Sequence, residues 1–116
     1  MSTASVATVS THILDTTVGR PAQGVPVALS VYGSAGWTAL AASATDADGR
    51  CKDLPAMPEG TTHVRLTFDT AAYLSAHPDA CAFFPEVTVT FAVVPGEHYH
   101  VPLLLNPFGY SVYRGS

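Results

Sequence analysis

Alternation of apolar and polar residues is the feature that most constrains what this chain can fold into. Segments 25–32, 61–68 and 86–93 repeat with a period of two, the period of a β-strand with one buried face. Turns rich in glycine and proline separate them at short intervals, which favours antiparallel sheets packed face to face. The predicted core-facing residues are Val25, Val27, Leu29 and Val31, then Thr62, Val64, Leu66 and Phe68, then Val87, Val89, Phe91 and Val93.

Two local signals interrupt the strand pattern. Residues 46–49 (DADG) predict a turn in which Gly49 takes a positive φ. Residues 69–77 (DTAAYLSAH) predict one short helix, which Asp69 caps and Pro78 ends. We therefore expect one all-β domain over residues 1–116, with about eight strands and one short helix.

Charge and composition exclude several classes of function. Five Lys and Arg residues and a net charge of -4 leave no basic stripe for nucleic acid. No apolar run approaches the roughly 18 residues of a membrane-spanning helix, and the N-terminus lacks a signal-peptide pattern, so we expect a cytoplasmic protein that does not bind membranes. Cys51 and Cys81 are more typical of reduced thiols than of a disulfide scaffold. Charged residues make up only 12% of the chain, which favours contacts between subunits.

Three histidines fall on the outward faces of predicted strands. Around residues 7–13 the alternation places His12 away from the core, and in residues 98–105 (HYHVPLLL) it does the same for His98 and His100. The last two imidazoles would lie about 7 Å apart on one face. That spacing suits a shared zinc ion, a catalytic imidazole beside a supporting one, or a solvated edge without a role.

Arg50 and the chain end could also carry chemistry. Arg50 follows the predicted turn directly, and a rigidly held guanidinium can bind a planar polar ligand, although a solvated surface cation has the same pattern. The chain ends in YRGS, residues 113–116, where alternation places Arg114 and Ser116 on the face opposite Tyr113. The alternative for this end is a frayed strand. The sequence contains no nucleophile elbow, phosphate-binding glycine loop or cysteine-rich metal site.

Three segments carry a further signal: STHILDTTVGRPAQGVPVAL, TDADGR and HYHVPLLLNPFGYSVYRGS. Together they resemble the transthyretin-like family, and within it the 5-hydroxyisourate hydrolases of urate breakdown. The resemblance runs from around Ser10 to Ser116 in the family's order. The terminal YRGS is similar to the tetrapeptide that distinguishes the hydrolases from transthyretin. One departure is Asn106, where the family commonly has serine.

This resemblance implies a fold, an assembly and a reaction. The implied fold is an antiparallel sandwich of two four-stranded sheets with one short helix, and the implied assembly is a homotetramer with sites at the dimer–dimer interface. The implied reaction is hydrolysis of 5-hydroxyisourate to 2-oxo-4-hydroxy-4-carboxy-5-ureidoimidazoline, in which water attacks the C6 carbonyl and the N1–C6 bond opens, without a cofactor or metal. The implied catalytic residues are His12, Arg50, His100 and Ser116; the implied substrate-binding residues are His12, Arg50, Tyr113, Arg114 and Gly115, with His98 in support.

Three other functions stay open at this point. A transthyretin-like carrier would bind a small molecule without consuming it. A zinc hydrolase would use His12, His98 and His100 as ligands. An interaction domain without a site would leave the three motif matches unexplained. Consumption of the substrate would distinguish an enzyme from a carrier, and activity that survives a chelator would exclude the zinc hydrolase.

Overall fold

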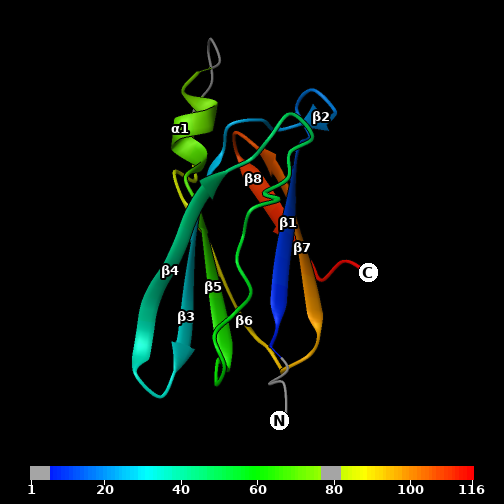
Figure 1. The fold of residues 1–116 in the computed structure, drawn as a ribbon. Helices are drawn as coiled ribbons and strands as arrows, with labels where there is room; N and C mark the ends of the chain where they lie inside the picture. The colour runs from blue at the N-terminus through cyan, green and yellow to red at the C-terminus, as the bar shows by residue number, and fades with distance from the viewer. Residues whose placement is uncertain (1–5, 77–81) are drawn as a thin grey trace.

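Two β-sheets pack face to face in the computed structural model, which describes residues 6–76 and 82–116 (Figure 1). The elements are β1 (Thr8–Asp15), β2 (Arg20–Pro21), β3 (Pro26–Gly33), β4 (Gly36–Ala44), β5 (His63–Phe68), α1 (Thr70–Leu74), β6 (Val87–Ala92), β7 (His98–Asn106) and β8 (Gly109–Val112). The first sheet has the strand order β2-β1-β7-β8 and the second the order β4-β3-β5-β6. These elements confirm the predicted sandwich of two four-stranded sheets with one short helix.

One strand pair differs from the predicted antiparallel arrangement. β1 and β7 run parallel, with Thr8 beside His98 and Ser10 beside His100, whereas the other named pairs are antiparallel. Alternation tells which residues of a strand share a face, but it does not tell the direction of the neighbouring strand. The parallel register brings the outward side chains of β1 and β7 to the same level.

The inward faces form the core largely as the alternation predicts. The prediction for Thr62 is wrong, because Thr62 is exposed and Thr61 is buried. β5 begins only at His63, and the Thr61 hydroxyl turns inward to donate to the Pro58 carbonyl at 2.8 Å. The fully buried core side chains include Ile13, Val25, Val27, Leu29, Val64, Leu66, Phe68, Val87, Leu103 and Leu105.

Helix α1 is capped and tied to the first sheet by hydrogen bonds. The Asp69 carboxylate accepts from the Ala72 amide at 3.0 Å, which confirms the predicted cap; Pro78 lies outside the described residues. The Tyr73 hydroxyl donates to the carboxylate of Asp15, a buried residue of β1, at 2.7 Å. Burial, reinforced by this carboxylate, raises the pKa of Tyr73 to about 12. Within the described residues, no helix is long and apolar enough to cross a membrane.

The turn between β7 and β8 contains the residue that departs from the family pattern. Asn106 accepts from the Phe108 amide at 3.0 Å and donates from its side-chain amide to the Thr16 hydroxyl at 3.3 Å. Asn106 thus closes the turn and links it to the end of β1.

Candidate active site

The candidate residues come from four chain segments that lie next to one another across the first sheet. Residue 50 forms an antiparallel bridge with His12 of β1, β1 pairs with β7, and His100 of β7 forms an antiparallel bridge with Gly115. Figure 1 shows the C-terminal segment leaving the sheet beside β7. His12 and His100 share the outer face, since the residues that alternate with them are buried. The structure therefore brings Arg50, His12, His100 and the chain end to one region.

The turn before Arg50 fixes that residue at the edge of β1. Gly49 has a φ of 76° and confirms the predicted turn, and its carbonyl accepts from the Ile13 amide at 2.8 Å. A Cβ at position 49 would collide with the Ile13 carbonyl oxygen, so only glycine fits against β1. Asp46 accepts from the amides of Asp48 and Arg50, and the Arg50 bond is the largest cause of its lowered pKa. The turn is thus closed by its own first residue.

A row of hydrogen bonds joins two of the three outward imidazoles. Thr8 Oγ1 lies 2.7 Å from Nδ1 of His98, and Nε2 of His98 lies 2.9 Å from Ser10 Oγ. The same Ser10 oxygen lies 2.8 Å from Nδ1 of His100. His98 is exposed and His100 is half-buried. The row therefore runs from solvent toward the candidate catalytic imidazole.

The surroundings of His100 favour its neutral form. Burial is the largest cause that lowers its pKa below the ordinary value of 6.5, and the charges of Arg50, His12 and His98 act in the same direction. A neutral imidazole can accept a proton at neutral pH.

The chain end packs directly against His100. The Gly115 amide donates to the His100 carbonyl at 2.8 Å. A Cβ at position 115 would lie 2.7 Å from Cδ2 of His100, so the glycine backbone touches the imidazole. Ser116 follows immediately and is exposed.

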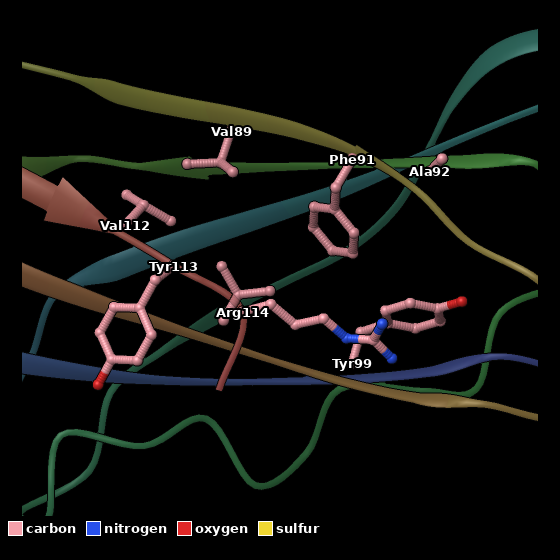
Figure 2. A pocket seen from close by; sticks show the side chains of 8 residues that line it. Val89, Phe91, Ala92, Tyr99, Val112, Tyr113 and Arg114 are labelled. Atoms are coloured by element: carbon pink, nitrogen blue, oxygen red, sulfur yellow. The ribbon is translucent and has the colours of Figure 1, made fainter. Parts of the chain in front are cut away.

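Arg114 and Tyr113 lie elsewhere, at the open edge between the sheets. The Arg114 guanidinium is 4.5 Å from the centre of the Tyr99 ring and 3.7 Å from the Glu97 carboxylate. Figure 2 shows this stacking and the side chain of Tyr113 extending away from it. Tyr99 belongs to the buried face of β7, so Arg114 is directed away from the imidazoles. A cavity of about 280 Å³ at this edge is lined by Val89, Phe91, Ala92, Tyr99, Val101, Val112, Tyr113 and Arg114.

Sequence reasoning missed the hydroxyls of Thr8 and Ser10. Both share the outer face of β1 with His12, but only the parallel register places them against His98 and His100. The two hydroxyls also line a second cavity of about 440 Å³, together with His98 and Arg50. Cys51 lies at this cavity as a buried free thiol, and burial is the main cause that raises its pKa.

Among residues 6–76 and 82–116, no group of three or more His, Cys, Asp or Glu side chains is arranged to hold a metal ion. His98 and His100 instead share the hydroxyl of Ser10.

Comparisons with known proteins agree with this architecture. The chain matches the HIUase/Transthyretin family over residues 9–115. The 5-hydroxyisourate hydrolase of Salmonella typhimurium is 46% identical over 109 residues, which span 92% of this chain and 79% of that protein. The structure of Klebsiella pneumoniae 5-hydroxyisourate hydrolase has a TM-score of 0.77 and 37% identity, with 95% of this chain and 94% of that chain covered. The structure of transthyretin from Sparus aurata has a TM-score of 0.83 and 33% identity, with 92% of this chain and 95% of that chain covered. The chain belongs to the HIUase/Transthyretin family.

Proposed function

We propose that this chain, as a single domain, hydrolyses 5-hydroxyisourate in urate degradation. The observation that carries the proposal is the meeting of Arg50, His12, His100 and the C-terminal segment at one region of the first sheet. The 46% identity to a protein named for this activity supports the same choice of substrate. The product would be 2-oxo-4-hydroxy-4-carboxy-5-ureidoimidazoline, formed when the N1–C6 bond opens.

In this proposal an imidazole takes the proton from the attacking water, and His100 is the better candidate. Its lowered pKa favours the neutral form, which can accept a proton, and Ser10 and Gly115 lie against its ring. General-base catalysis of this kind contributes roughly 10² to 10⁴ in rate. His12 would then bind the substrate or share the proton transfer.

Arg50 would hold the planar substrate and stabilise the negative charge that develops on the attacked C6 carbonyl. A guanidinium offers several donors in a fixed plane, which matches the carbonyl oxygens of a flat heterocycle. Its position depends on the turn at Gly49, which places the residue on the edge of β1 opposite His12. Ser116 would orient the water or the imidazole. Binding roles for Tyr113, Arg114 and Gly115 stay predictions.

We further propose a homotetramer in which the outer face of the first sheet meets another dimer. Several large apolar side chains are exposed in the single chain, among them Phe83 at 65% and Phe108 at 69%, which is expected of surfaces that subunits cover. Sedimentation equilibrium tests the assembly, and a stable monomer at micromolar concentration would contradict it. A cytoplasmic location stays a prediction.

The main alternative is a carrier, because the transthyretin structure has the higher TM-score and a shared fold does not decide function. The deciding experiment generates 5-hydroxyisourate from urate with urate oxidase and follows its ultraviolet band. Hydrolysis predicts catalytic decay at sub-stoichiometric protein, and a carrier predicts decay at the spontaneous rate. The same assay after chelation tests the zinc hydrolase: activity that disappears with the metal and returns with zinc would replace the imidazole-base mechanism.

A further inference from the structure

We propose that Ser10 is a positioning residue that couples the protonation of His98 to the tautomer of His100. The proposal rests on the proposed function, in which His100 is the base. Because Nδ1 of His100 contacts Ser10, Nε2 is the nitrogen that is left to take the proton. The geometry that carries it is the continuous row Thr8–His98–Ser10–His100, with separations of 2.7, 2.9 and 2.8 Å. The row depends on the parallel pairing of β1 and β7, which sets Thr8 and Ser10 directly beside the two histidines.

The argument starts from the single proton of the Ser10 hydroxyl. A serine oxygen can accept two hydrogen bonds but donates only one. Ser10 Oγ lies within hydrogen-bond distance of one nitrogen from each imidazole. If it donates to one ring, it must accept from the other. The tautomers of His98 and His100 are therefore linked through this oxygen.

Neutral His98 permits the tautomer that catalysis needs. With its proton on Nδ1, His98 donates to the Thr8 hydroxyl and accepts from Ser10 at Nε2. Ser10 then accepts from Nδ1–H of His100, which leaves the lone pair of Nε2 free to take a proton. In this state Ser10 sets the base in its active form.

Protonated His98 favours the opposite arrangement. Both ring nitrogens of an imidazolium are donors, so Nε2–H of His98 donates to Ser10 and the Ser10 hydroxyl no longer donates to His98. The Ser10 proton is then released for a hydrogen bond to Nδ1 of His100, which favours the neutral His100 tautomer that carries its proton on Nε2. That tautomer has no free lone pair at Nε2 and cannot act as the base. One proton taken up at the exposed ring thus switches off the half-buried one.

The charged groups around the row are compatible with this coupling. Arg50 and His12 act on His100 from the neighbouring segment and from β1, and both disfavour its protonated form. Arg50 and Lys52 line the cavity beside His98. Lys52 also pairs with Asp46 and Asp48 at 3.6 and 3.7 Å.

The direct test is ¹⁵N NMR of the histidine side chains across about pH 5 to 8, the range in which imidazoles titrate. In the wild-type protein we expect the His100 proton on Nδ1 at high pH and on Nε2 as His98 protonates. In Ser10→Ala the His100 tautomer should no longer follow His98. The proposal would be overturned if the His100 tautomer in the wild-type protein did not change as His98 is protonated. It would also be overturned if the tautomer change in Ser10→Ala were the same as in the wild-type protein.

The pH dependence of kcat is a second measurement, and it would not change if Ser10 had only a structural role. Ser10→Ala should lower kcat roughly two- to tenfold, the usual worth of one hydrogen bond, with KM little changed. The fall of kcat on the acid side of the pH profile should move to lower pH in Ser10→Ala, because activity is then lost only when His100 itself is protonated. Ser10→Thr keeps a hydroxyl and should restore the wild-type profile, and Ser30→Ala on β3 serves as the matched control.

The two proposals can fail separately. The NMR experiment needs no turnover, so it judges the tautomer coupling even if the wild-type protein consumes no substrate. A lower rate in Ser10→Ala with an unchanged acid limb and an unchanged tautomer would contradict the coupling while leaving the hydrolase intact.

Discussion

Replacing Gly115 with alanine should reduce catalysis sharply while leaving the fold intact. The added methyl would lie 2.7 Å from Cδ2 of His100 and 3.2 Å from Cγ of Pro102. Ordinary contact begins at 3.4 Å, so raising the first separation from 2.7 Å to 3.4 Å displaces the ring by 0.7 Å. Pro102 belongs to β7 and the Gly115 backbone is tied to this strand through the His100 carbonyl, so the imidazole side chain is the group that moves.

The size of the effect follows from this displacement. A misplacement of about 1 Å in a reacting group can cost on the order of 10²-fold in rate. We therefore expect kcat/KM to fall roughly ten- to a hundredfold. Gly115 does not have a positive φ, so alanine adds no backbone strain. The free energy of unfolding should change by about 1 kcal/mol or less.

The assay is the initial rate of 5-hydroxyisourate decay, measured beside urea unfolding of the same variant. Gly109→Ala is a matched control, because its methyl would lie 3.7 Å from Oδ1 of Asn106, an ordinary contact. The control should keep the wild-type rate. If Gly115→Ala also keeps it, either His100 does not act at the reacting centre or the chain end does not pack against it.

Four further predictions concern Tyr73, His100 and the chain end. Tyr73→Phe should destabilise the protein by about 1–3 kcal/mol in urea unfolding, because the buried Asp15 loses a donor; unchanged stability would contradict this. Since the pKa of Tyr73 is raised to about 12, its contribution to the free energy of unfolding should be present below about pH 10 and be lost as the pH rises toward 12. Thermal unfolding of Tyr73→Phe over this pH range should not show that loss of stability. Because the pKa of His100 is lowered, the unfolded chain binds the proton more readily, so the free energy of unfolding should fall as the pH drops below about 6.5; His100→Asn should flatten this slope. A C-terminal extension beyond Ser116 should slow hydrolysis at least about tenfold while an N-terminal one should not, and equal rates would remove Ser116 from the site.

The sequence predicts the faces of the strands and the turn because these are local properties. Alternation alone places His12, His98 and His100 on outer faces, and the structure confirms this. The turn at Gly49 is equally local, because two nearby features specify it: the positive φ of Gly49 and the hydrogen bond from the Asp48 amide to the Asp46 carboxylate. These features need no knowledge of neighbouring strands.

The partners of those side chains depend on contacts between distant segments. The hydrogen bonds of Ser10 require β1 and β7 to be parallel and in one register, which no pattern within either strand specifies. Arg114 illustrates the same limit. Alternation places it opposite Tyr113, but its stacking on Tyr99 and its pairing with Glu97 arise only when the chain end folds over the sheet edge.

The most direct test of the account is the rate of 5-hydroxyisourate decay with His100→Ala, compared with the wild-type protein at equal concentration. The variant is checked for the wild-type fold and assembly before the measurement. We predict a loss of roughly 10² to 10⁴ in kcat, the contribution of a general base. Decay at the wild-type rate by the folded variant would show that His100 is not the base, and would contradict the central claim.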